Sequence, residues 1–303
     1  MRSPRTTTRA TPIRSPAESP AGQGPAEAGA GSALQGATAT LLLTLAARAH
    51  SGSVADASVF SDPEARRIAA SLPFDISGYA ADDAFVRSIV LRAALFDRFA
   101  AEFLAAHPDG FCISLGAGLC TRRSRIDAAL VARSHWLNID LPDAIELRQR
   151  HMTRHEGESD LACSVLDESW LDAAGLPGDR PVLAMLEGVC PYLPQAPLEA
   201  LLRSLAARFE HARVPCVLVL DHVHPVLARQ SMAVGGMRLP VVSGFENAAQ
   251  VAGLHPSMRV LSEDHIYAQF SERHSLFEAA FRATTGAWPY GVVRLALGPQ
   301  GDE

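Results

Sequence analysis

A glycine-containing turn between two apolar runs constrains the fold of this chain more than any other feature. Residues 111–122 read F-C-I-S-L-G-A-G-L-C-T-R, and a second apolar run, at residues 135–139, ends in Asp140, 24 residues after Gly116. Doubly wound α/β sheets hold adenosine-containing ligands in this way. Gly116 and Gly118 let the backbone turn sharply and approach a ligand closely, because they carry no Cβ. Asp140, at the tip of the next strand, can accept hydrogen bonds from both ribose hydroxyls, so we predict an adenosine cofactor.

The residues that are absent narrow the choice of cofactor. A dinucleotide fingerprint needs a third glycine three residues after the second, and position 121 is threonine. All 27 basic residues are arginine, so the chain has neither the lysine of a phosphate-binding P-loop nor a Schiff-base lysine for pyridoxal phosphate. S-adenosylmethionine (SAM) contains ribose and adenine but no phosphate, and it fits the pattern. A nicotinamide cofactor and a glycine turn that serves packing alone are the alternatives.

The composition is that of an ordinary globular protein, with 48% apolar and 20% charged residues. The net charge of −6 argues against nucleic acid or an anionic membrane as the main partner. The five cysteines are scattered through apolar runs, and no pair has the spacing of zinc ligands. We therefore expect reduced thiols, a cytoplasmic location and no metal site. The sequence does not indicate an oligomeric state.

The first 32 residues differ in composition from the rest of the chain. They are rich in Pro, Ser, Thr, Ala and Gly, with almost no large apolar side chain. Such a segment cannot bury enough apolar surface to offset its ordering entropy, so we predict a disordered tail over residues 1–32. Four arginines and no acid in its first seventeen residues make a transit peptide the alternative. The apolar run at residues 41–47 is too short to span a membrane.

Apolar periodicity beyond the tail predicts an α/β fold with a parallel sheet and right-handed crossovers. Helices are expected at 33–50, from Pro63, at 83–106, 143–154, near Trp170 and at 197–211. Strands are expected at 111–115, 135–139, 161–165, 181–186 and 215–220, with two closing strands at 258–261 and 292–297. The domain 33–303 then divides into a helical extension (33–108), a cofactor-binding core (109–224), a cap inserted after the fifth strand (225–257) and closing strands (258–303).

Ligands of such sheets bind beyond the carboxyl ends of the strands, and here four of the five ends carry an acid. These acids are Asp140, Asp167, Glu187 and Asp221. An acidic rim suits the sulfonium cation of SAM. Asp167 could accept from the adenine amino group and Glu187 from the ammonium of the methionine portion. Each acid could instead cap a helix.

The carboxylate of the methionine portion needs a cation. Arg92, in the helix before the first strand, and Arg48, in the N-terminal helix, are the candidates. Either could instead be a solvated surface arginine.

Five segments resemble, in order and spacing, the leucine carboxyl methyltransferase family, in particular its bacterial branch of tetracenomycin-type polyketide O-methyltransferases. They are L-R-A-A-L-F-D at 91–97, L-G-A-G-L-C-T-R at 115–122, I-D-L-P-D at 139–143, Asp167 with Trp170, and E-G-V-C-P-Y-L at 187–193. The resemblance covers about residues 35–225. It implies a class I SAM-dependent methyltransferase with a Rossmann-like sheet of about seven strands, an N-terminal helical extension and a cap.

The resemblance also implies roles for individual residues. Arg92 matches the arginine that holds the cofactor carboxylate, Gly116 the glycine of the cofactor turn and Asp140 the ribose acid. Glu187 and Tyr192 match the segment that lines the methyl-transfer site, and Arg48 falls near a basic residue that is lysine in some relatives. The chain departs from the family at Cys120, where the usual aspartate would cap the following helix or orient the turn.

The methyl acceptor decides whether the reaction needs a base. A carboxylate is ionised at neutral pH and needs none, whereas a phenol does. His222 and His224, just past the fifth predicted strand, are the paired candidates for a base, or else ordinary loop histidines. We predict a cytoplasmic SAM-dependent O-methyltransferase acting on the carboxylate or hydroxyl of a small, polyketide-like molecule, with a carboxylate favoured. The alternatives are a nicotinamide oxidoreductase and, because of Cys120, a non-catalytic SAM-binding protein.

Overall fold

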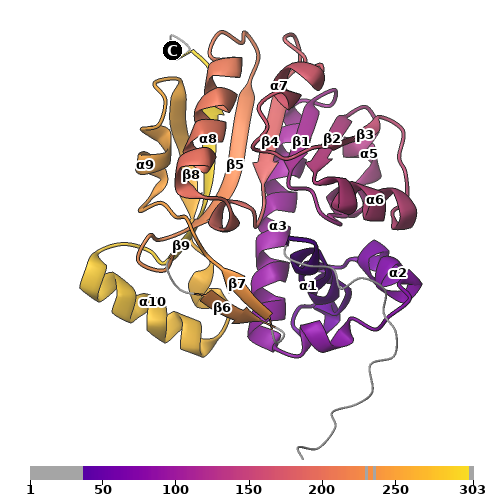
Figure 1. The fold of residues 1–303 in the computed structure, drawn as a ribbon, viewed down its shortest axis with the longest axis vertical. Helices are drawn as coiled ribbons and strands as arrows, with labels where there is room; N and C mark the ends of the chain where they lie inside the picture. The colour runs from indigo at the N-terminus through magenta and orange to yellow at the C-terminus, as the bar shows by residue number, and fades with distance from the viewer. Residues whose placement is uncertain (1–36, 229–230, 235–236, 300–303) are drawn as a thin grey trace, which may run out of the picture. The chain divides into compact units, whose positions relative to one another are not determined.

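The computed structural model describes residues 37–228, 231–234 and 237–299, and it contains a seven-stranded sheet in the order β3-β2-β1-β4-β5-β9-β8 (Figure 1). The strands are β1 (Phe111–Leu115), β2 (His135–Asp140), β3 (Glu158–Ala162), β4 (Val182–Leu186), β5 (Cys216–Val223), β8 (Met258–Asp264) and β9 (Tyr290–Leu297). β1 to β5 pair in parallel, and β9 runs antiparallel to both β5 and β8. The predicted fold class is confirmed. The predicted tail, residues 1–32, lies outside the described residues.

Parallel pairing brings the carboxyl ends of the strands to one edge of the sheet. Phe111 lies opposite both His135 of β2 and Val182 of β4, so the glycine turn after β1 lies next to the ends of both neighbours. β4 is buried along its whole length, as expected of a central parallel strand that is covered on both faces. The functional side chains are therefore expected at this edge.

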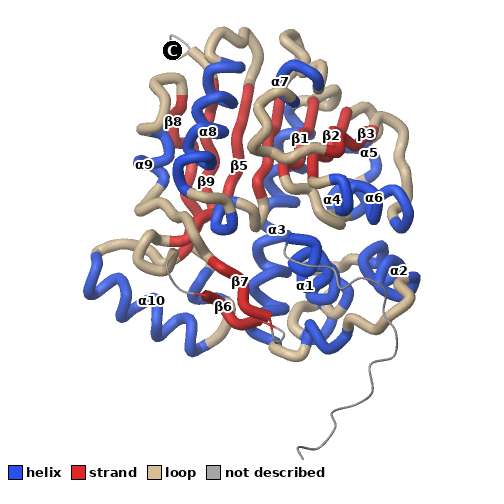
Figure 2. The backbone as a smooth tube through the Cα atoms, viewed as in Figure 1, coloured by secondary structure: helices blue, strands red, loops and turns tan. Residues whose placement is uncertain are grey.

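Helices cover both faces of the sheet (Figure 2). α3 (Asp83–Ala106) and α5 (Ala128–Val131) pack on one face with Cys112, while α7 (Trp170–Ala173), α8 (Gln195–Phe209) and α9 (Ala248–Ala252) pack on the other with Ile113 and Leu115. Successive side chains of β1 thus enter opposite cores. The prediction of a helix at 83–106 is confirmed. Three further α-helices are α4 (Arg122–Arg125), α6 (Pro142–His151) and α10 (Glu272–Thr285).

Two helices precede α3 in the described part of the chain: α1 packs against α3, and α2 packs against α1. α1 (Ala37–Ala49) buries Leu45 and Ala46 completely, and α2 (Pro63–Ser71) begins at Asp62, whose side chain accepts from the backbone N–H of Ala65 at 2.9 Å. Such a side-chain cap satisfies one of the free N–H groups at a helix start. The predicted helix start at Pro63 is confirmed. No helix among the described residues has both the length and the apolar character needed to cross a bilayer.

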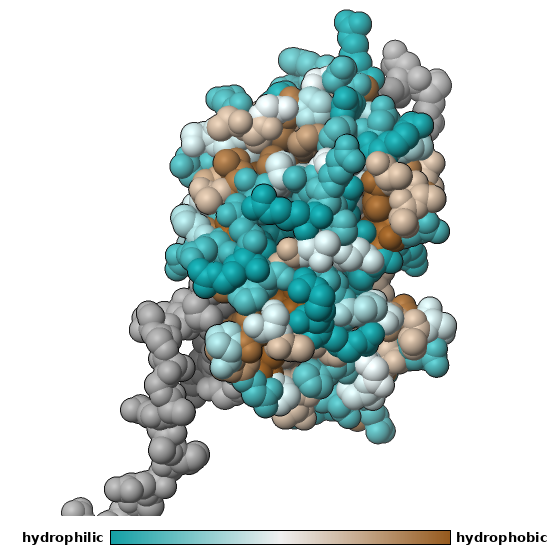
Figure 3. Space-filling model, turned by 90° about the vertical axis from the view of Figure 1, so that its right-hand side faces the viewer, coloured by the Kyte–Doolittle hydropathy of each residue, from teal (hydrophilic) through white to brown (hydrophobic). Residues whose placement is uncertain are grey.

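The segment after β5 contains the hairpin β6 (Ser231–Val234) and β7 (Met237–Pro240) and then α9. Short 3-10 helices complete the structure: η1 (Ser51–Ser53), η2 (Ser77–Ala80), η3 (Cys190–Tyr192) and η4 (Tyr267–Gln269). The side of the protein shown in Figure 3 is mostly hydrophilic, and its apolar side chains form small, separate patches.

Four strand predictions differ from the structure by two residues or more. β8 continues to Asp264 rather than ending at residue 261, and β9 begins at Tyr290 rather than at residue 292. β3 occupies residues 158–162 rather than 161–165. As an edge strand it buries little, so its polar first half pairs with β2 although it lacks the apolar residues that marked the prediction. β5 continues to Val223 rather than ending at residue 220, because antiparallel pairing with β9 extends as far as Tyr290.

Candidate cofactor site

A cavity lies at the carboxyl edge of the sheet, between the glycine turn, the end of β4 and the helices α1 and α3. It encloses roughly 760 Å³, including its open mouth. Six of the predicted site residues line it: Arg48, Arg92, Gly116, Gly118, Glu187 and Tyr192. Asp140, Asp167 and His222 are not among its lining residues. The structure therefore brings most of the predicted cofactor residues together in one place.

The glycine turn has the backbone conformation that requires glycine. The φ angles of Gly116 and Gly118 are +70° and +48°, values that residues with a Cβ rarely adopt. The N–H groups of Gly116 and Ala117 both donate to the carbonyl of Ile139, at 2.8 and 3.1 Å. A Cβ at position 116 would meet Val189 Cγ2 at 2.5 Å. The glycine is needed for packing against the segment after β4. The close approach of a ligand to Gly116 stays a prediction.

The carboxylate of Asp140 holds this turn in place. It accepts from the N–H of Gly118 at 2.6 Å and from the N–H of Leu141 at 2.7 Å, one bond to each oxygen. Burial raises the pKa of Asp140 in spite of these bonds. Each carboxylate oxygen has more than one acceptor site, so both can still receive a hydrogen bond from a ribose hydroxyl.

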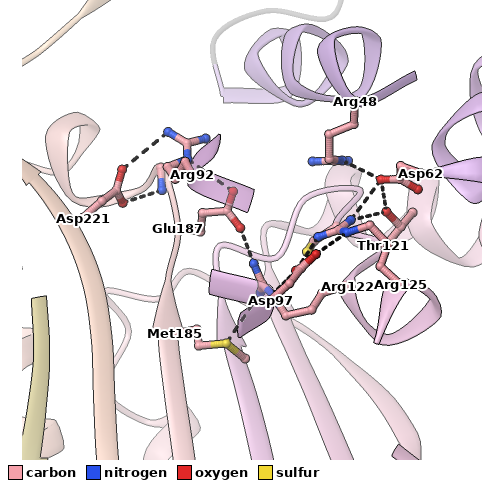
Figure 4. A network of polar contacts seen from close by, with 12 residues as sticks. Arg48, Asp62, Arg92, Asp97, Thr121, Arg122, Arg125, Met185, Glu187 and Asp221 are labelled. Atoms are coloured by element: carbon pink, nitrogen blue, oxygen red, sulfur yellow. Dashed lines mark hydrogen bonds and ion pairs between the residues drawn. The ribbon is translucent and has the colours of Figure 1, made fainter. Parts of the chain in front are cut away.

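A chain of alternating charges runs along the cavity (Figure 4). Four arginines alternate with four carboxylates in the order Arg48, Asp62, Arg125, Asp97, Arg122, Glu187, Arg92 and Asp221. The N···O distances run from 2.7 Å for Arg125–Asp97 to 3.4 Å for Arg92–Asp221, and Arg122 also pairs with Glu187. Because the charges balance, each buried ion has a partner, as burial of charge requires.

Among these eight charged residues, Arg92 and Glu187 are best placed to bind a ligand. Both line the cavity, and Arg92 Nε lies 3.2 Å from Glu187 Oε1. Burial opposes the charge of Glu187, but Arg122 and Arg92 outweigh it and hold the pKa at about 2. Burial likewise opposes the charge of Arg92, yet Asp221 and Glu187 raise its pKa. An amino-acid zwitterion would therefore meet a fixed cation beside a fixed anion, which fits the methionine portion of SAM.

Gly188, in the loop after β4, cannot be replaced by a residue with a Cβ. Its φ is +65°, and a Cβ there would lie 2.7 Å from Arg92 Nη2. The Gly188 N–H donates to Asp221 Oδ1 at 2.6 Å, and Tyr290 donates its hydroxyl to Asp221 Oδ2 at 2.9 Å. Asp221 thus ties the loop, Arg92 and β9 together, and burial raises its pKa in spite of Arg92.

Sequence reasoning missed Asp97 and Arg122 as site residues. Arg122 is 2% exposed and joins Asp97 to Glu187, so it fixes the carboxylate that faces the cavity. Both residues end segments that carry the family resemblance, at 91–97 and 115–122. That position was the only available signal, since no local spacing joins residues of α3 and α4 to the end of β4.

Two arginines hold the carbonyl groups of the glycine turn. Arg48 Nη2 donates to the carbonyl of Leu119 at 2.7 Å, and Arg148 Nη1 donates to that of Gly118 at 2.8 Å. Cys120 lines the cavity beside them. The N-cap of α4 is Thr121, whose hydroxyl donates to Asp62 at 2.5 Å instead of capping the helix. The cysteine therefore does not occupy the N-cap position of α4.

The other predicted residues have different surroundings. Tyr192 lines the cavity, and burial raises its pKa, so its hydroxyl is neutral near pH 7. Asp167 is exposed and accepts from the N–H of Ser169 at 3.2 Å. His222 lies within β5, where it is 1% exposed and its Nε2 is 3.3 Å from Glu263 Oε1. The structure therefore brings Tyr192, but neither Asp167 nor His222, to the cavity.

His224 is also buried, and its ring packs edge-on against Phe281. Burial lowers its pKa. Within the part of the chain that the structure describes, no group of three or more His, Cys, Asp or Glu side chains is arranged to hold a metal.

A sheet of this strand order, with a glycine turn after β1 and an acid at the end of β2, defines the class I fold of SAM-dependent methyltransferases. Residues 41–206 match the family model for leucine carboxyl methyltransferase, and the chain belongs to this family. The family prediction is confirmed.

Two relatives are similar over the same region. One is the tetracenomycin polyketide synthesis O-methyltransferase TcmP of Streptomyces glaucescens, 36% identical over 170 residues, which are 56% of this chain and 61% of the relative. The other is the S-adenosyl-L-methionine-dependent methyltransferase dpfgK of Gibberella zeae, 30% identical over 193 residues, 60% of this chain and 64% of the relative. Each match spans less than two thirds of the relative's length.

Among solved structures, a SAM-dependent methyltransferase from Anabaena variabilis is 14% identical and superposes with a TM-score of 0.46 over 68% of this chain and 84% of the other. A likeness this weak assigns no function.

Proposed function

We propose that this protein is a SAM-dependent O-methyltransferase whose acceptor is a small molecule. The observation that carries the proposal is the Arg92–Glu187 pair at the cavity, 3.2 Å apart, next to a glycine turn that Asp140 holds in place. In this assignment Arg92 binds the cofactor carboxylate, Glu187 the ammonium and Asp140 the ribose. Arg48 and the backbone of Gly116 and Gly118 support the turn.

SAM supplies an electrophilic methyl group, so the protein has to bind and orient SAM and the acceptor and forms no covalent bond with either. In-line displacement at a methyl carbon gains much of its rate from positioning. Tyr192 is the predicted catalytic residue that lines the cavity. Its hydroxyl stays protonated because burial raises its pKa, so it would donate a hydrogen bond that orients the acceptor. His222, which we predicted as a base, does not line the cofactor cavity and would have to act from outside it.

The acceptor is proposed to be the carboxylate or hydroxyl of a polyketide-like metabolite, as the name of the Streptomyces relative suggests. A carboxylate is favoured because the family model that matches this chain is that of a carboxyl methyltransferase. The cytoplasmic location stays a prediction, and it rests on five cysteines that are all free thiols.

Calorimetric titration with SAM, with its demethylated product S-adenosylhomocysteine and with NAD tests the class of cofactor. We expect the first two to bind and NAD not to bind. Arg92→Leu should abolish binding, whereas Arg87→Leu, five residues earlier on α3, should not change it. Binding of NAD alone would favour an oxidoreductase. SAM binding without methyl transfer to any of a panel of aromatic acids and phenols would favour a non-catalytic SAM-binding protein.

A further inference from the structure

A second cavity lies next to the cofactor cavity, and the proposed cofactor chemistry does not use it. It encloses roughly 1340 Å³, including its open mouth. Its walls come from the start of α3, the end of β5 and the segment from η4 to α10. Phe85 lines both cavities. A molecule in the second cavity would therefore lie against the same side chain that borders the site of the methyl donor.

Aromatic rings dominate one wall of this cavity. Tyr267 packs against Phe270, His274 and Phe277, with ring centroids 5.4, 4.9 and 5.8 Å away. All four line the cavity. Tilted and edge-on ring pairs at these separations attract one another, so the aromatic wall is preformed. Such a wall favours a flat ring system over a flexible chain, since a rigid ring loses little conformational freedom on binding.

The rim of the cavity carries one cationic and one anionic side chain, Arg273 and Asp82. Arg273 lines it and is exposed, and it has no ion pair among the described residues. The carboxylate of Asp82, the acidic side chain in the lining, already accepts from the N–H groups of Ala84 and Phe85 at 2.8 and 3.2 Å. The two charges balance, but the Asp82 carboxylate is engaged at the start of α3, so Arg273 is the rim group that can pair with an acidic group of a ligand.

His274 is the titratable side chain within the aromatic wall. Its Nδ1 lies 2.7 Å from Ser271 Oγ, which fixes the plane of the ring. Burial lowers its pKa and Arg273 lowers it further, whereas the opposing effect of Asp82 is smaller than that of burial. A neutral imidazole near pH 7 adds a polar atom to the wall without adding a charge that would compete with Arg273.

We propose that this second cavity binds the methyl acceptor and that it selects a flat aromatic acid. The inference rests on the proposed function, because it makes the cavity the acceptor half of the same site. The rings of the acceptor lie against Tyr267 and Phe277, and its acidic character is matched by Arg273.

Binding of 2-naphthoate to the full chain, measured by calorimetry with S-adenosylhomocysteine saturating, tests the inference. We expect 2-naphthoate to bind and decanoate, a flexible acid, to bind more weakly. Phe277→Ala should weaken 2-naphthoate about five- to tenfold, the loss expected for one aromatic contact. Leu276→Ala is the matched control, because Leu276 is 67% exposed on the same helix and does not line the cavity. It should leave the affinity unchanged, and both variants should bind S-adenosylhomocysteine as the wild type does.

Ala84→Trp gives a second, independent measurement. Ala84 lines the cavity from α3, so an indole there should fill the space and abolish 2-naphthoate binding while S-adenosylhomocysteine still binds. The inference is overturned if 2-naphthoate does not bind to a protein that binds S-adenosylhomocysteine, if the two compete, or if Phe277→Ala and Leu276→Ala have equal effects. Failure of S-adenosylhomocysteine itself to bind would instead remove the proposed function and this inference with it.

Discussion

Arg92 contacts two carboxylates at once, and this pairing limits what the cofactor cavity can bind. A ligand with only a carboxylate would compete with Glu187 and Asp221 for the guanidinium. A ligand with only an ammonium would compete with Arg92 for Glu187. A zwitterion pairs with both Arg92 and Glu187 and leaves the net charge of the eight alternating residues balanced. The residues of the cavity therefore favour an amino acid or a molecule that contains one.

Replacement of Asp140 tests the ribose contact. Asp140→Ala removes the acceptor for two ribose hydroxyls and also for the N–H groups of Gly118 and Leu141. We expect SAM binding to weaken by about 1.5–3 kcal/mol, the usual cost of unpaired polar groups. Asp143→Ala, at an exposed position in the first turn of α6, is the control and should bind normally. Near-normal affinity of Asp140→Ala in a SAM titration would contradict the assignment.

Glu187 should make the stability of the protein depend on pH in the acid range. Its pKa is about 2 in the folded protein against an ordinary value of 4.5, so the stabilisation is complete above about pH 4.5 and is lost as the pH falls toward 2. A shift of this size corresponds to about 3 kcal/mol, as an upper estimate. Glu187→Gln should be less stable than the wild type in urea at pH 7, and the difference should shrink at pH 3.

The control for this experiment is Glu168→Gln, since Glu168 is exposed. Its unfolding free energy should follow that of the wild type at both pH values. A difference between wild type and Glu187→Gln that stays constant between pH 7 and pH 3 would mean that the charge of Glu187 does not stabilise the fold.

At the scale of elements, α1 closes the cofactor cavity against the glycine turn. Its Leu41 side chain would lie 2.7 Å from a Cβ at position 118. Gly118→Ala should therefore strain the backbone, because φ is +48°. The new methyl group should also displace α1 from the turn by its contact with Leu41. We expect weaker SAM binding, by roughly tenfold or more, and a lower melting temperature, by a few degrees.

Gly175 offers a matched control, because its φ is +57° and a Cβ there would meet nothing within 4 Å. Gly175→Ala should lower the melting temperature through backbone strain alone and leave SAM binding intact. Adding Leu41→Ala to Gly118→Ala should recover part of the lost affinity. If the double variant binds no better than Gly118→Ala, contact with α1 is not the cause.

The elements that sequence predicted best are those whose signal is local. The 24 residues of α3 repeat apolar side chains at helical spacing, and β1 and β4 are short apolar runs, so their bounds were predicted to within a residue. The end of β5 was not predicted correctly, because it depends on pairing with β9, about 70 residues later. His222 was therefore expected in a loop, whereas it faces Glu263 inside the sheet.

The cofactor site shows the same division between local and distant information. Gly116, Gly118 and Asp140 follow from the turn and the strand ends, which are local patterns. Arg122 and Asp97 act through contacts between segments 25 residues apart, and nothing near either residue shows the partner. The second cavity could not be foreseen either, because its walls come from α3, β5 and α10.

At the scale of the whole molecule, the two adjoining cavities divide the proposed reaction into a donor site and an acceptor site. The chemistry of the acceptor then determines how the rate depends on pH. A carboxylate, with a pKa near 4, is fully ionised at neutral pH and needs no base. With SAM saturating, we expect the rate to stay flat from about pH 6 to 9, and His222→Gln, His224→Gln and His274→Gln to change it only slightly. His274 is included because it lines the second cavity.

A phenol acceptor would behave differently, because its pKa lies near 10 and its proton must be removed during methyl transfer. The rate would then rise with pH until the base is neutral, and it would fall by roughly 10²-fold or more when that base is replaced. The initial rate of methyl transfer to matched naphthoic acid and naphthol acceptors, measured from pH 6 to 9 in all three variants, separates the two cases. A steep profile that collapses in His274→Gln alone would overturn the carboxylate prediction and identify His274 as the base. A loss of rate confined to His222→Gln would instead require the contact between His222 and Glu263 to open during catalysis.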